Sequence, residues 1–102
     1  MESDRQVMTA GARLALARWE RRLGVPESPE PGLVALLDRH AARIRDSVSG
    51  MTVANLAAYA DGVADTAAAR GWTHPDAGAD WRAASWPSLH LLAVCLLARS
   101  LP

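Results

Sequence analysis

Three glycines divide the sequence at the points where apolar patterns of helical period end. In the segments before Gly24, Gly50 and Gly71, apolar side chains recur every three or four residues, which predicts one buried stripe per helix. Glycine accepts the left-handed backbone that ends many helices, and Pro26 prevents the first helix from continuing. The pattern predicts helices over residues 4–23, 31–48 and 53–70, with ends near the three glycines.

A fourth predicted helix is apolar on nearly every face. Ser85 is a good N-cap and Pro87 suits a first turn, so this helix is expected to begin there and to run to Arg99. A helix without a polar face lies at the centre of a domain or contacts a second molecule. The expected fold is therefore all-α, a single domain over residues 1–102 built as a compact bundle of about four helices with a buried apolar C-terminal helix. The surplus apolar surface of that helix also predicts a homodimer.

The composition limits the partners and the compartment. Eleven basic residues, all of them arginine, balance 11 acidic residues, so no net charge draws the protein to nucleic acid or to an anionic membrane. The longest apolar run, residues 91–98, is too short to cross a bilayer, so no membrane partner is expected. Cys95 has no second cysteine to pair with, which favours a reducing compartment. A soluble cytoplasmic protein is expected.

Two histidines are the candidate catalytic residues. His40 falls inside the apolar stripe of its helix, so we expect it to be buried and hydrogen-bonded to a backbone carbonyl or a carboxylate, or else tuned for acid/base chemistry. His90 is nearly the only polar group in the first two turns of the C-terminal helix, where, with Ser88, it is expected to form a solvent-facing edge. Whether the two imidazoles meet is left open by the sequence.

Candidate binding residues are aromatic or basic. Trp72, Trp81 and Trp86 lie within fifteen residues of one another around a predicted loop, and such side chains suit either a core lid or a recognition surface. Arg39 and Arg43 recur one helical turn apart, a spacing at which they can receive a carboxylate or phosphate or simply remain solvated.

Metal and thiol chemistry are not indicated. The sequence has no His-x3-His, Cys-x2-Cys or His-x-Glu pattern, so neither a metal site nor a cofactor is expected. The residues around Cys95 are apolar and disfavour its thiolate, so this cysteine is expected to be buried and inert.

Residues 56–63 allow an alternative interpretation as a helix-turn-helix with Gly62 as the turn. The segment that would then enter a DNA groove offers only Asp65, Thr66 and Arg70, and Asp65 would repel phosphate, so nucleic acid is not the expected partner. If the helix is instead continuous, Gly62 indicates close packing or a kink.

Three segments resemble a family of small uncharacterised actinobacterial proteins associated with natural-product biosynthesis. They are PGLVALLDRHAARIRD at residues 31–46, AAARGW at 67–72 and LHLLAVCLLA at 89–98. In that family an Asp-Trp pair leads almost directly into the last helix, whereas residues 82–87 separate the two here. The resemblance implies a cytosolic accessory protein of a peptide or other secondary-metabolite pathway, and it carries over no catalytic residue.

These observations leave three functions open. The first is a helical accessory protein that binds a partner protein or peptide of a biosynthetic pathway. The second is a small helical enzyme of the cyclase or lyase type that uses His40 or His90 as an acid/base in a tryptophan-lined pocket. The third is a DNA-binding regulator. A cavity that reaches a histidine would favour the second, and an exposed apolar helix face would favour the first.

Overall fold

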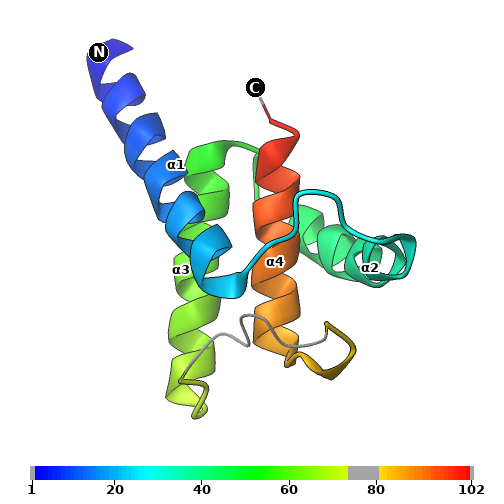
Figure 1. Cartoon of the computed structure of the whole chain (residues 1–102). Helices are drawn as coiled ribbons and strands as arrows, with labels where there is room; N and C mark the ends of the chain where they lie inside the picture. Colours follow the sequence, from blue (N-terminus) through cyan, green and yellow to red (C-terminus); the bar gives the residue numbers. More distant parts are fainter. Residues whose placement is uncertain (1, 74–80, 102) are drawn as a thin grey trace.

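A computed structural model describes the backbone of residues 2–73 and 81–101 and the side chains of residues 9–73 and 82–101. In this part of the chain all regular structure is helical and no strand occurs, which confirms the all-α prediction (Figure 1). The elements are α1 (Glu2–Leu23), α2 (Pro31–Ser47), α3 (Val53–Ala69), the short 3₁₀ helix η1 (Trp81–Ala83) and α4 (Trp86–Arg99). Each α-helix lies within two residues of its predicted bounds.

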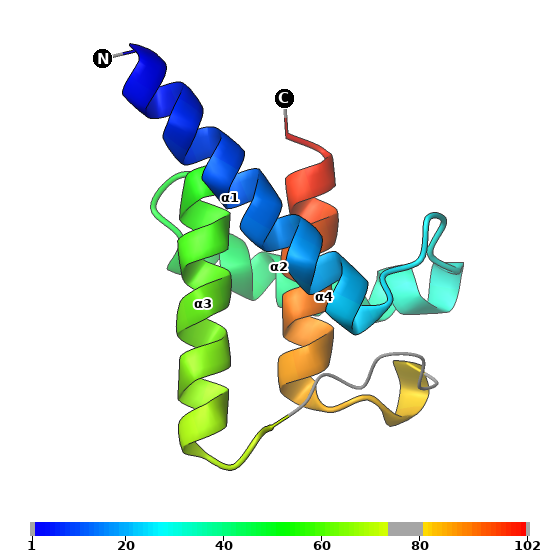
Figure 2. The same cartoon turned by 60° about the vertical axis from the view of Figure 1, so that its left-hand side comes forward.

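Helix α4 is the centre of the bundle. It packs against α1, α2 and α3, and α1 also packs against α3. Figures 1 and 2 show α3 and α4 side by side and antiparallel, with α1 crossing them on one side. Helix α2 packs against α4 on another side. The expected central position of the apolar C-terminal helix is therefore confirmed.

Local capping explains where the helices begin and end. Gly24 has φ +67° and Gly71 has φ +101°, and in each case the next residue donates its N–H five residues back, from Val25 to Glu20 and from Trp72 to Ala67. This is the Schellman arrangement, and it places Val25 and Trp72 against the core. Helix α2 ends differently, at Ser47, without a left-handed residue at Gly50.

Helix α3 is continuous through Gly62. Its first turn is capped as predicted, because the Thr52 hydroxyl accepts from the Asn55 N–H at 3.1 Å. The helix-turn-helix interpretation of residues 56–63 is wrong, since this stretch is one uninterrupted helix. Close packing at Gly62 is also wrong, because a Cβ atom placed there meets no atom of the described residues within 4 Å.

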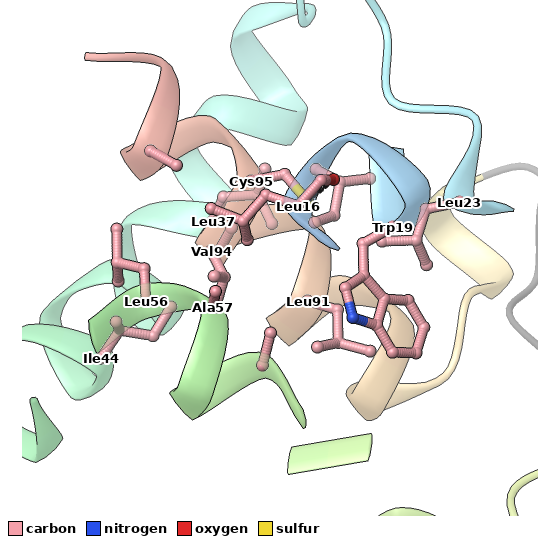
Figure 3. Close-up of a cluster of buried hydrophobic side chains, with 14 of the residues drawn as sticks. Leu16, Trp19, Leu23, Leu37, Ile44, Leu56, Ala57, Leu91, Val94 and Cys95 are labelled. Carbon is pink, nitrogen blue, oxygen red and sulfur yellow. Dashed lines mark hydrogen bonds between the residues drawn. The ribbon is translucent and has the colours of Figure 1, made fainter. Parts of the chain in front are cut away.

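The apolar core joins all four helices. Figure 3 shows part of it, with Leu16 and Trp19 of α1 facing Leu91, Val94 and Cys95 of α4. Side chains from α2 and α3 complete it, among them Leu37, Ile44, Leu56 and Ala57. Cys95 is 1% exposed and its thiol lies 3.9 Å from the Leu16 carbonyl oxygen. Its burial is therefore as predicted.

The neighbours of α4 cover most of its surface. Residues 88–95 and Ala98 are buried, and only Leu96 and Leu97 among the later apolar residues are partly exposed. The surplus apolar surface from which a homodimer was predicted is thus small, and the homodimer stays a prediction. No helix in the described residues is long and apolar enough to span a membrane.

Candidate functional site

Side chains from three helices form a continuous hydrogen-bonded row. His40 on α2 and His90 on α4 meet through their Nδ1 atoms at 2.9 Å, and the Tyr59 hydroxyl on α3 lies 2.7 Å from Nε2 of His90. Both nitrogens of the His90 ring are therefore engaged, and that side chain is 0% exposed. We call Tyr59, His90 and His40 the hydrogen-bond relay.

Trp86 fixes the ring at the middle of the relay. Its indole stacks on the His90 imidazole with ring centroids 4.3 Å apart and planes 14° from parallel, and it also contacts the His40 ring at 5.6 Å. Trp86 and His90 are one turn apart on α4, so the helix itself sets this stacking. The stacking leaves Trp86 half exposed while it shields the relay from solvent on one side.

Burial keeps the two imidazoles of the relay neutral at physiological pH. Desolvation, with the charges of His40 and Arg43 as lesser causes, lowers the pKa of His90 from 6.5 to about 4. Desolvation and the nearby Arg43 guanidinium also lower the pKa of His40. Two neutral imidazoles that meet nitrogen to nitrogen must share one proton between those atoms, so one ring donates and the other accepts.

The tyrosine end of the relay lines an aromatic groove of about 650 Å³ between the end of α3 and the start of α4. This volume is typical of pockets that bind small molecules or apolar side chains. Helix α3 leaves one wall open at Gly62, and the chain that follows α3 brings Trp72 into the same lining as Trp86 of α4. The lining comprises Tyr59, Gly62, Val63, Thr66, Ala67, Arg70, Trp72, Trp86 and Pro87.

The histidine end lines a different, smaller space. This arginine pocket of about 250 Å³ is formed by Leu36, Arg39, His40, Arg43 and Trp86. Arg43 lies one turn after both Arg39 and His40 along α2, which brings the three side chains to one side of the helix. Trp86 lines both the groove and the arginine pocket. The relay therefore connects the two spaces, with Tyr59 in the lining of the groove and His40 in the lining of the arginine pocket.

Trp72 joins the groove to the core. The Trp72 ring stacks on Trp19 of α1, with ring centroids 6.3 Å apart. The Arg22 guanidinium lies over the Trp19 ring, 4.7 Å from its centroid. The indole N–H of Trp72 is buried and has no hydrogen-bond partner among the described residues. A buried donor of this kind is uncommon in folded proteins.

The structure brings together most of the residues singled out from the sequence. His40 is buried as predicted, but its partner is His90 and not a carbonyl or a carboxylate. The solvent-facing edge expected for Ser88 and His90 is wrong, since they are 4% and 0% exposed. Trp81 begins η1, but its side chain, like the whole of His74, lies outside the described residues.

Tyr59 is the site residue that the sequence interpretation missed. It lies at the margin of the α3 stripe, where the neighbouring side chains are small, and it is only partly buried. One feature of the sequence could have indicated Tyr59: it is the single tyrosine of the chain and lies on an alanine-rich helix. Such a side chain reaches further than its neighbours, which is how its hydroxyl meets α4.

The described residues contain no group of three or more His, Cys, Asp or Glu side chains that could hold a metal ion. The relay supplies imidazole nitrogens that bind each other and a hydroxyl, so its chemistry is that of hydrogen bonding and proton exchange.

Comparison with known proteins places this site within a family. The model of a family of unknown function, DUF6401, matches residues 31–102, which is more than half of the chain. The chain belongs to the DUF6401 family. The DUF6401 match includes α2, α3 and α4, and hence the relay, the groove and the arginine pocket, whereas α1 lies before it. No curated protein and no solved structure matches the chain.

Proposed function

We propose that this protein is a cytoplasmic accessory protein of a natural-product pathway that binds a partner protein or peptide through the aromatic groove. The observation that carries the proposal is the groove itself: about 650 Å³ lined by two tryptophans and a tyrosine, beside a glycine that leaves one wall open. Rigid aromatic side chains provide large contact area at low entropic cost, which suits recognition of an apolar segment. The pathway context rests on the resemblance of residues 31–98.

An acid/base enzyme is the second candidate, and the relay is the observation that favours it. A general base works best with a pKa near the pH at which the enzyme operates. Burial lowers the pKa of His90 to about 4, so this imidazole is a weak base at neutral pH. Binding is therefore the function that we infer.

A DNA-binding regulator has less support. The one motif that suggested it lies within the continuous helix α3, and the net charge of zero supplies no electrostatic attraction to phosphate.

The test uses a matched pair of substitutions. Gly62→Leu fills the groove without a clash, because a Cβ at Gly62 has open space around it. Gly11→Leu is the control, since Gly11 is equally open but lies on α1, outside the groove lining. Both changes raise helix propensity by a similar amount, so the folds are expected to remain stable.

The wild-type protein and the two variants are each used to capture the products of the neighbouring biosynthetic genes after co-expression. We expect the wild type and Gly11→Leu to retain one such protein or peptide, and Gly62→Leu to lose it. Equal capture by all three proteins, or capture by none of them, would contradict the proposal.

A further inference from the structure

The relay can be ordered in two directions, and the direction determines what Tyr59 offers to the groove. When His90 donates from Nδ1 to His40, its Nε2 is unprotonated and accepts from the Tyr59 hydroxyl. When His40 donates instead, His90 carries its proton on Nε2 and donates to the Tyr59 oxygen. The Tyr59 O–H is then available to a second acceptor.

The empty groove favours the first direction. In the second direction the 2.7 Å hydrogen bond is kept with His90 as the donor, but the Tyr59 O–H then points toward a lining that is mainly apolar and offers it no acceptor. In the free protein Tyr59 therefore donates to His90, and His90 donates to His40.

A ligand that carries an acceptor reverses this preference. Tyr59 belongs to the groove lining, and its O–H becomes a donor to the groove when the relay is reversed. A carbonyl oxygen accepts two hydrogen bonds, whereas a hydrocarbon accepts none.

We propose that the groove selects an apolar group that carries a carbonyl, as an apolar residue of a peptide does, and that binding reverses the relay so that Tyr59 donates to this carbonyl. The inference rests on the proposed binding function of the groove and names the chemistry of its ligand. Trp86, stacked on the His90 ring, holds that ring in place while its protons exchange.

The reversal conserves protons. One proton passes from Tyr59 to Nε2 of His90 and one from Nδ1 of His90 to Nδ1 of His40. His40 releases its Nε2 proton to solvent and Tyr59 takes one up, so every group stays neutral. No bond between heavy atoms forms or breaks.

The experiment compares two probes of similar shape, 4-phenylbutan-2-one, which has a carbonyl, and butylbenzene, which has none. Affinities for the wild type and for Tyr59→Phe are measured by NMR titration. We expect Tyr59→Phe to weaken binding of the ketone roughly 5- to 10-fold and to change binding of the hydrocarbon less than about twofold, because one neutral hydrogen bond is lost. The Gly62→Leu variant is expected to bind neither probe.

A second measurement on the wild type does not depend on how well Tyr59→Phe folds. Nitrogen shifts of the histidine rings report which nitrogen carries the proton, and saturation with the ketone is expected to move the His90 proton from Nδ1 to Nε2, whereas butylbenzene leaves it on Nδ1. If butylbenzene binds, but the His90 tautomer in the ketone complex is the same as in the free protein, the relay reversal alone is overturned. Failure of both probes to bind the wild type would overturn the proposed groove as well.

Discussion

Each half of α4 contains fully buried side chains, and the two halves differ in what those side chains contact. In the C-terminal half, Val94 and Cys95 lie among apolar side chains, and the Cys95 thiol lies 3.9 Å from the carbonyl oxygen of Leu16 on α1. In the N-terminal half, His90 is as fully enclosed but bonds side chains of α2 and α3, each of which lines a pocket. Burial alone therefore says little about the role of a side chain, because that role depends on the groups that the buried side chain contacts.

The largest expected contrast is in chemical reactivity. Burial, with the carboxylate of Glu20 as a lesser cause, raises the pKa of the Cys95 thiol from 9.0 to about 12. We expect iodoacetamide to label native Cys95 roughly a thousandfold more slowly than the unfolded chain, since each pKa unit reduces the thiolate about tenfold. Mass spectrometry of timed reactions at pH 8 with and without denaturant measures the ratio. Labelling of the native protein within minutes would show that this half of α4 opens readily.

Truncation of an apolar side chain in the same core is expected to have the largest effect on stability. Leu91 is 0% exposed, so Leu91→Ala leaves a cavity in addition to losing apolar contact. The free energy of unfolding is expected to fall by about 3 kcal/mol, within a usual range of roughly 2–5 kcal/mol. Urea denaturation measures it, and a loss below about 1 kcal/mol would mean that the core is loosely packed.

The relay predicts a pH dependence with a definite sign. In the unfolded chain a histidine binds its proton near pH 6.5, whereas the folded state lowers the pKa of His90 to about 4 and also lowers that of His40. The unfolded state therefore binds more protons in this window, so stability is greatest above pH 6.5 and falls as the pH falls toward 4. The expected slope is up to about 1.4 kcal/mol per pH unit for each histidine. Denaturation midpoints at pH 7.5, 6 and 5 measure it, and stability that is flat or rises on acidification would contradict the assigned shifts.

Removing one member of the histidine pair is expected to cost less than the core truncation and to show coupling. His90→Leu leaves the buried His40 nitrogen without its partner and removes the partner of the partly buried Tyr59 hydroxyl, which together cost about 1–3 kcal/mol. The double variant His40→Leu with His90→Leu removes both imidazoles, so its loss is expected to be about 1 kcal/mol smaller than the sum of the single losses. Strict additivity in a double-mutant cycle would mean that the two rings do not stabilise each other. The double variant is also the control for the pH series, because it lacks both titrating groups.

Local signals in the sequence predicted most of the fold. Gly24, Gly71 and Thr52 act through backbone geometry and hydrogen bonds within a few residues, so their effects can be read without knowledge of the partners. Gly62 could not be interpreted from its sequence neighbours, because it lines an open groove between helices and makes no close contact that the helix itself would explain.

The site was only partly predictable, for a physical reason. Helical phase placed His40 on a buried face, but the environment of His90 depended on which helices pack against α4. On a helix that is apolar all round, helical phase defines no solvent-facing side. The prediction that Ser88 and His90 face solvent is therefore wrong. Tyr59 was missed because its partner lies 31 residues away, a distance over which periodicity carries no information.

The most direct test of the relay is the protonation state of its two imidazoles in the free protein. Long-range proton–nitrogen NMR spectra at pH 7 identify, for each ring, which nitrogen carries the proton. The relay requires two neutral rings of opposite tautomers, with the proton on Nδ1 of His90 and on Nε2 of His40. Two neutral rings of the same tautomer would contradict the Nδ1-to-Nδ1 bond of 2.9 Å and with it the connection between the groove and the arginine pocket. A charged imidazole at this pH would contradict the lowered pKa values of the pair.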